Sequence, residues 1–242
     1  MFKSMKKGMA MLTLGLTFTA MYSFTVNKHD KETLVKDKSS SEAIIKFDME
    51  FQSDDPQMKQ QLFMMDNSKM VMAFKGQKFY SETKIGAIQN STTIIDKDAD
   101  KMVILMSGMM GKKATQKEGL ENEEEGNSSE VEFEKTDETK EILGYECFKI
   151  VGEDEEGNTS IYWVTEEITP EVQTKNFGSD KFKGMPLEFE IIQAQMTMKF
   201  TATEVSTEIS KKDEKKYFTT EIPEGYDEMP YDEYIKMSGG GL

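Results

Sequence analysis

The 242-residue chain contains 45 acidic and 30 basic side chains, and its formal net charge at pH 7 is −15. This balance argues against nucleic-acid binding and against docking on anionic lipid surfaces, because both interactions depend on Lys and Arg. The single cysteine, Cys147, excludes an intramolecular disulfide. Its position in a strand-like stretch among aromatic residues predicts a buried, inert thiol.

The N-terminal residues have the pattern of a secretory signal peptide. Three lysines among the first seven residues precede an apolar run, Gly8 to Phe24. This run is shorter than the roughly 20 apolar residues that span a bilayer. We therefore predict that residues 1–26 are a signal peptide and that the protein is exported to the periplasm or cell envelope. An uncleaved anchor is the alternative, and membrane contact is expected only through it or through envelope partners.

The charged, serine-rich residues 27–42 predict a solvated tether. Residues 43–226 are predicted to form a single antiparallel β domain, because apolar and polar residues alternate there with the two-residue period of strands. Polar turns rather than helices separate the first strands, which indicates a meander. These predicted strands are Ala43–Phe51, Met70–Phe74, Phe79–Ile85, Ile88–Ile95 and Met102–Met106.

A short helix is predicted after the first strand. Asp55 offers an N-cap there, and Pro56 suits the first helical position. The alternative is that Leu62 to Met65 begin a strand.

The acidic residues 118–130 almost lack apolar side chains and predict an exposed, flexible loop. A calcium site among the glutamates of this loop is an alternative, but the spaced Asp, Asn and Gly ligand pattern of a dedicated calcium loop is missing.

The clearest strand signal is a hairpin between Tyr145 and Thr165. Alternation places Phe148 and Ile150 on one face of its first strand, and Ile161 and Trp163 on one face of its second strand. Both faces of the hairpin carry large apolar groups. We therefore expect it to be central in its sheet and covered on at least one side.

After the hairpin, further strands are predicted at Leu187–Ile191 and from Met196 towards Ile209. The next stretch, Lys211 to Lys216, has the composition of a charged turn. Phe218 to Ile222 is predicted to be a last edge strand. Residues 227–242 are predicted to be a short helical or irregular tail.

Four short motifs carry a family resemblance. They are Gly111-Lys112-Lys113-Ala114, Lys140-Glu141-Ile142-Leu143-Gly144-Tyr145-Glu146-Cys147, Tyr162-Trp163-Val164-Thr165 and Lys183-Gly184-Met185-Pro186-Leu187. In their order and spacing, over roughly Ile44 to Tyr226, the chain resembles domain-of-unknown-function family 4412, an uncharacterised exported bacterial family. That family is similar in architecture to the LolA/LolB-type lipoprotein carriers, in which a curved antiparallel sheet forms a half-open barrel lidded by helices.

The resemblance implies a mainly β fold, a β-rich α+β arrangement with a single curved antiparallel sheet, a half-open barrel and one or two short helices. It implies no reaction, because the family has no assigned activity. The chain departs from the carrier pattern in two respects: it has little helical sequence for a lid, and it contains the acidic insertion 118–130.

The residues exclude several kinds of catalytic chemistry. His29 is the sole histidine and lies in the tether, which excludes triads with a histidine base and histidine-ligated metal sites. The chain has no phosphate-binding glycine loop and no dinucleotide fingerprint. Nothing singles out a catalytic pair among the carboxylates. We therefore predict no enzyme activity, no cofactor and no metal site.

Methionine is the residue that stands out, with 20 in the chain. Its flexible, polarizable side chain suits surfaces that accept variable apolar shapes. A curved sheet with an incompletely filled concave face would make such residues an apolar groove, whereas the alternative is that they simply fill the core. The groove candidates are Met70, Met72, Phe74, Phe148, Ile150, Ile161, Trp163, Met196, Met198 and Phe200.

These features together predict a non-enzymatic cell-envelope binding protein for a lipophilic ligand or a lipidated partner. The alternative is a structural or protein-interaction module with a closed apolar core and no ligand. The first function requires a cavity of several hundred Å³. The second requires an exposed apolar patch or an unprotected strand edge.

Overall fold

The computed structural model describes residues 39–59, 62–109, 111–120, 132–153, 157, 159–172, 183–193 and 196–237. All of them belong to one structural unit, Asp37–Leu242. The predicted signal peptide, most of the tether, most of the acidic loop and the glutamates of the calcium alternative lie outside the described residues.

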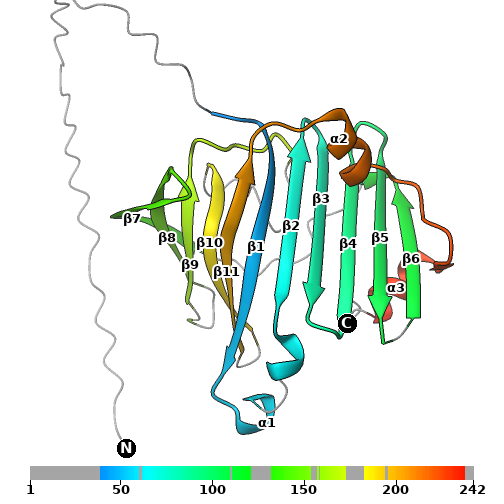
Figure 1. Ribbon diagram of the computed structural model, residues 1–242, viewed down its shortest axis with the longest axis horizontal. Coiled ribbons are helices and arrows are strands. Elements are labelled where there is room, and N and C mark those ends of the chain that lie inside the picture. The colour runs from blue at the N-terminus through cyan, green and yellow to red at the C-terminus, as the bar shows by residue number, and fades with distance from the viewer. Residues whose placement is uncertain are drawn as a thin grey trace, which may run out of the picture. The chain divides into compact units, whose positions relative to one another are not determined.

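Twelve strands of the described residues form one open sheet, in the order β12-β6-β5-β4-β3-β2-β1-β11-β10-β9-β8-β7 (Figure 1). The strands are β1 (Glu42–Ser53), β2 (Ser68–Lys75), β3 (Lys78–Ile85), β4 (Gln89–Asp96), β5 (Lys101–Gly108), β6 (Gly111–Glu118), β7 (Glu132–Ile142), β8 (Tyr145–Glu153), β9 (Thr159–Thr165), β10 (Met185–Gln193), β11 (Met196–Ser206) and β12 (Asp227–Glu228). Every neighbouring pair is antiparallel except β12 with β6. The expected mainly β, single-sheet, half-open fold is confirmed.

Two meanders make up this sheet, and β1 joins them. Strands β1 to β6 form the first meander and β7 to β11 the second, while β1 also pairs with β11 over most of its length, from Ile44↔Ser206 to Ser53↔Met196. The expectation that the β8–β9 hairpin is central is therefore wrong, because only β7 lies outside it. Alternation identifies a strand but does not specify its neighbours, and the long-range β1–β11 pairing places β1 at the centre.

The first helical region agrees with its prediction. The short helix α1 (Pro56–Lys59) and the 3₁₀ turn η1 (Leu62–Met65) connect β1 to β2. The Asp55 carboxylate accepts a hydrogen bond of 2.9 Å from the backbone N–H of Met58, as expected of an N-cap. Leu62 to Met65 do not begin a strand.

The predicted charged turn at Lys211–Lys216 is wrong, because these residues belong to the helix α2 (Lys211–Tyr217). The Ser210 hydroxyl caps this helix by accepting a 3.2 Å hydrogen bond from the N–H of Asp213. Acidic residues lie in its first turn and lysines in its last. Both sets of charges therefore interact favourably with the helix dipole.

The predicted edge strand at Phe218–Ile222 is also wrong. Phe218 is buried and Ile222 packs against the same apolar cluster, so this segment covers a face of the sheet instead of extending its edge. The strand at this edge is β12, which pairs in parallel with β6. The tail then forms the helix α3 (Tyr231–Met237), which is the helical one of its two predicted alternatives.

At β1 and β2 the two faces of the sheet carry separate apolar clusters, and we name each face after one buried residue. On the Phe47 face, the Phe47 ring lies 5.8 Å from that of Phe189, which stacks on Phe200 at 4.3 Å. On the Tyr80 face, the Tyr80 ring lies 4.9 Å from that of Tyr217 in α2. In Figure 1, α2 accordingly lies over the upper ends of β3 and β4. Within the described ranges, no helix is long and apolar enough to cross a membrane.

Candidate functional site

Four of the groove candidates lie inside the closed apolar cluster of the Phe47 face. Met70, Met72, Phe74 and Phe200 are all buried there. Register explains their position, because Met70 pairs with Phe47 and directly paired residues of antiparallel strands share a face. These side chains contact neighbouring side chains of the core, so they do not line an open groove.

The candidates of the hairpin divide between the two faces. Ile150 pairs with Tyr162, and Phe148 pairs with Val164. Ile161 and Trp163 alternate with those partners and therefore lie on the opposite face from Phe148 and Ile150. The structure does not bring the four together.

Lysines contact the aromatic candidates of this hairpin. The Lys135 ammonium lies 3.5 Å from the Phe148 ring centroid, and that of Lys140 lies 4.2 Å from the Trp163 ring. The Lys140 ammonium is also 2.9 Å from a carboxylate oxygen of Glu188. These rings are therefore engaged by cations of the protein itself.

The last two candidates, Met196 and Met198, lie at the end of the sheet where β1 stops. Met196 pairs with Ser53, and Met198 pairs with Phe51. Both methionines are half-buried. Their partners Ser53 and Phe51 line an opening in the protein, but none of the ten candidates is itself a lining residue of it.

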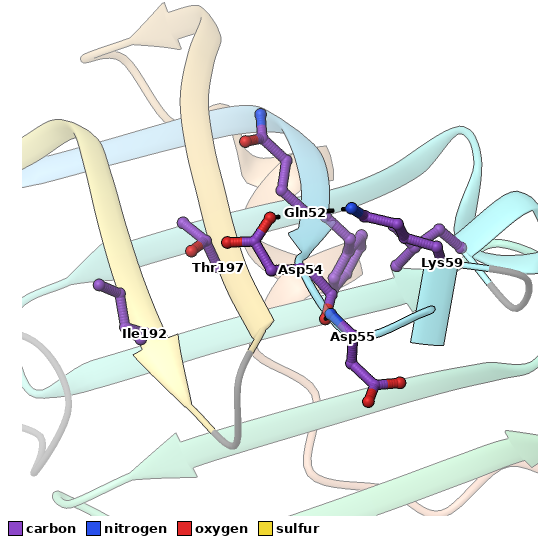
Figure 2. Close-up of a pocket in the computed structure, with 9 residues that line it drawn as sticks. Gln52, Asp54, Asp55, Lys59, Ile192 and Thr197 are labelled. Carbon is purple, nitrogen blue, oxygen red and sulfur yellow. Dashed lines mark hydrogen bonds and ion pairs between the residues drawn. The ribbon is translucent and has the colours of Figure 1, made fainter. Parts of the chain in front are cut away.

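The opening is a pocket of about 850 Å³ at this end, formed by β1, α1, η1, β10 and β11. We call it the end pocket. Its apolar lining residues are Phe51, Leu62 and Ile192. Its polar lining residues are Gln52, Ser53, Asp54, Asp55, Lys59 and Thr197. Figure 2 shows Ile192 and Thr197 on one side of the pocket and Lys59 on the other, with Asp54 between them.

The charged groups at the mouth of the pocket are held by local structure. The Ser53 hydroxyl accepts a 3.2 Å hydrogen bond from the N–H of Asp55, whose carboxylate caps α1. The Asp54 carboxylate is fully exposed and lies 3.8 Å from the Lys59 ammonium, a loose ion pair. One of the two aspartates is thus committed to a helix cap, while the other faces solvent.

Large apolar side chains are exposed around the end pocket and along the same end of the sheet. Phe63 is 71% exposed and Ile192 45% exposed, and Met64 is also exposed. Met109, in the β5–β6 turn, is exposed at this end too. We call these four side chains the end rim.

Backbone hydrogen bonds tie the turns that carry the rim to one another. The Met64 carbonyl accepts from the N–H of Ala87, and the Ile88 carbonyl accepts from the N–H of Met109, each at 3.4 Å. Gly86 allows the close approach of η1, because a Cβ at this position would overlap the Met64 carbonyl oxygen and its φ is +46°. The parts of the rim at Met64 and Met109 are therefore tied to the β3–β4 turn.

The end pocket is lined by both apolar and polar side chains. Among the described residues, no group of three or more His, Cys, Asp or Glu side chains is placed to hold a metal ion. The pocket combines apolar walls with one exposed carboxylate and one ammonium group. Sequence reasoning missed Phe51, Leu62 and Ile192 as lining residues. Two signals in the sequence could have indicated them. One is the apolar run Leu62–Met65 between two strands, and the other is Ile192, which follows Ile191 and breaks the alternation.

Cys147 is fully buried, as predicted. Burial raises the pKa of its thiol from 9.0 to about 11. Because the thiolate is the reactive form, the native protein should react slowly with a maleimide at neutral pH and quickly after denaturation. Rapid labelling of the native protein would contradict this.

The same pKa difference predicts an effect of pH on stability. An unfolded chain loses the thiol proton near pH 9, but the folded protein holds it to about pH 11. The free energy of unfolding should therefore fall as pH rises from about 9 to about 11. Below pH 9 this thiol should not make the free energy of unfolding depend on pH. Urea unfolding of the parent protein and of Cys147→Ala at several pH values measures the difference.

The fold and site define an open, antiparallel β-sheet protein with a pocket at one end. No protein-family model matches the chain, and no curated protein matches it. The resemblance to family 4412 and to the LolA/LolB-type carriers therefore stays a prediction.

The chain matches several solved structures, of which two are examples. A structure of PNGF-II matches 81% of this chain at 16% identity and a TM-score of 0.44, and the chain covers 32% of that protein's length. An uncharacterized conserved protein from Thermus thermophilus matches 81% of this chain and 94% of its own length, at 10% identity and a TM-score of 0.45. At these values, neither match bears on what this protein binds.

Proposed function

We propose that this protein is a non-enzymatic binding protein of the cell envelope, and that its ligand is an acyl chain or the lipid-modified end of a partner protein. The end pocket carries the proposal, because its volume of about 850 Å³ suits such a ligand and Ile192 is an exposed apolar residue in its wall. Ligand pockets are typically about 300–1,000 Å³. Burial of exposed apolar surface contributes about 25 cal/mol per Å².

The ligand would reach the end of the Phe47 face at the lining residue Phe51, because Ile192 and Thr197 lie on the opposite face of their strands. Phe51, Met198 and Ile191 are half-buried neighbours there, because Met198 pairs with both of the others. Deeper on the same face, Phe189 and Phe200 are buried and stacked. The accessible part of this face therefore ends before Phe200, and Met198 provides an adaptable side chain at its border.

Charge at the pocket mouth favours one kind of head group. Asp54 and Asp55 contribute two carboxylates, against the single ammonium of Lys59. The protein as a whole is acidic, with a net charge of −15. A neutral or cationic lipophile should therefore bind better than a fatty-acid anion.

A titration with a fluorescent acyl probe that has a neutral head group tests this function. The parent protein, cleared of lipid, should bind the probe at micromolar concentration, and Ile192→Asp should bind it about tenfold or more weakly because a carboxylate replaces an apolar wall. Leu143→Asp is the matched control. Leu143 is 49% exposed, similar to Ile192, but lies in the β7–β8 turn away from the pocket. Equal binding by the two variants, or none by the parent, would refute the lipophilic ligand.

A second candidate function is favoured by the closed core. Met70, Met72 and Phe74 are buried against neighbouring side chains, as in an interaction module whose apolar face needs no ligand. In that case the end rim would contact a partner protein. Native mass spectrometry of protein purified from the envelope separates the two functions, because a carrier should retain lipid and an interaction module should not.

A further inference from the structure

The C-terminal tail closes one edge of the sheet through a very short pairing. Asp227 and Glu228 pair with Lys113 and Ala114, so β12 covers two of the eight residues of β6. The N–H of Met229 donates a 2.9 Å hydrogen bond to the Ala114 carbonyl. Pro230 follows directly and has no N–H to continue the ladder. The tail therefore makes few main-chain contacts with this edge.

The two partners have complementary charge. Strand β6 contains three lysines and one glutamate in a chain with a net charge of −15, whereas residues 224–233 contain five acidic residues and no basic one. The Lys113 ammonium lies 3.2 Å from the Asp227 carboxylate. The ammonium groups of Lys112 and Lys117 lie 5.6 and 4.9 Å from the ring centroids of Tyr226 and Tyr231. Each lysine of β6 thus contacts the tail.

The opposite edge of the sheet lacks these features. Strand β7 mixes both signs of charge, and its register with β8 shifts between Lys135 and Thr139. The bulge and the acidic excess of β7 both oppose the addition of an acidic strand there. The edge at β6 is the one with an excess of basic residues, because β7 contains five acidic residues and only two lysines.

We propose that the β6 edge is a strand-addition site for an extended acidic segment of a partner protein with flanking tyrosines, and that residues 226–231 of this chain hold the site closed. Main-chain hydrogen bonds to an exposed edge supply affinity in such a site, and side-chain contacts supply specificity. A tethered tail acts at an effective concentration of about millimolar, so a partner strand binds well only where the tail is loosened. The tail remains anchored through Tyr217 and Phe218, which are buried on the Tyr80 face.

A labelled peptide with the sequence of residues 224–233 tests the proposal on the full chain. Met229→Pro removes the N–H that donates to Ala114, and Met229→Ala is the matched control that keeps it. By fluorescence polarisation, Met229→Pro should bind the peptide about tenfold or more tightly than Met229→Ala or the parent. Added salt should weaken this binding, and a peptide with lysines in place of its Asp-Glu pair should not bind.

A second variant guards against a folding defect in the first. Asp227→Lys changes a side chain that is 78% exposed, breaks the ion pair with Lys113 and should also increase peptide binding several-fold. The proposal is wrong if neither variant binds the peptide better than Met229→Ala. It is also wrong if the released edge takes up no peptide but pairs two copies of the chain, seen as a dimer by light scattering.

Discussion

Replacing Met72 by aspartate should abolish cooperative folding at 25 °C. Met72 has no exposed surface and lies in the closed cluster of the Phe47 face, where it pairs with Ile45. Burial of an unpaired carboxylate costs several kcal/mol, a large part of the roughly 5–15 kcal/mol that stabilises a typical domain. Far-UV circular dichroism and urea unfolding measure the loss.

Two other variants show whether burial causes the effect. Met72→Leu conserves volume and should cost less than about 1.5 kcal/mol. Met198→Asp should be tolerated better than Met72→Asp, because Met198 is half-buried beside the end pocket. If Met72→Asp unfolds cooperatively at the same urea concentration as the parent, the centre of the Phe47 face is open. Met72 would then again be a candidate residue of an apolar groove.

Replacing Phe189 by alanine should lower the free energy of unfolding by about 3–5 kcal/mol. Phe189 is buried at the meeting point of both meanders, with its ring 4.3 Å from Phe200, 5.8 Å from Phe47 and 6.1 Å from Tyr162. Its loss leaves a cavity and removes three aromatic contacts. Urea unfolding with an unchanged m-value would report this as a stability change.

Phe63→Ala is the matched control, because it removes the same side chain from the end rim, where it is 71% exposed. Its free energy of unfolding should stay within about 0.5 kcal/mol of the parent. The probe titration should give the opposite ranking of the two variants if the rim takes part in binding. Phe63→Ala should then weaken probe binding, whereas folded Phe189→Ala should leave it unchanged. Equal destabilisation by the two substitutions would contradict the burial difference.

The helix α2 and the strand β6 show where sequence patterns mislead. The run from Lys211 to Lys216 has the composition of a turn, but the Ser210 cap and the burial of Tyr217 stabilise a helix whose charged residues face solvent. Strand β6 (GKKATQKE) has almost no apolar alternation, and it was not predicted. Its lysines suit the edge of a sheet, where polar side chains replace the usual pattern.

Local alternation was sufficient to predict most strands, the antiparallel order of the first meander, the β8–β9 hairpin and the burial of Cys147. These properties depend on side chains a few residues apart, and the period of two determines which of them share a face. Alternation also placed Met70 and Met72 on one face.

Only the tertiary structure decided that this face is closed. Pairing of β1 with β11 joins segments far apart in the chain and brings Phe200 and Phe189 beside Phe47. The same pairing sets the end pocket between Phe51 and Thr197. Contacts between residues so far apart in the sequence cannot be predicted from local patterns. The entropy lost in closing the long intervening chain is recovered only when the rest of the sheet also forms.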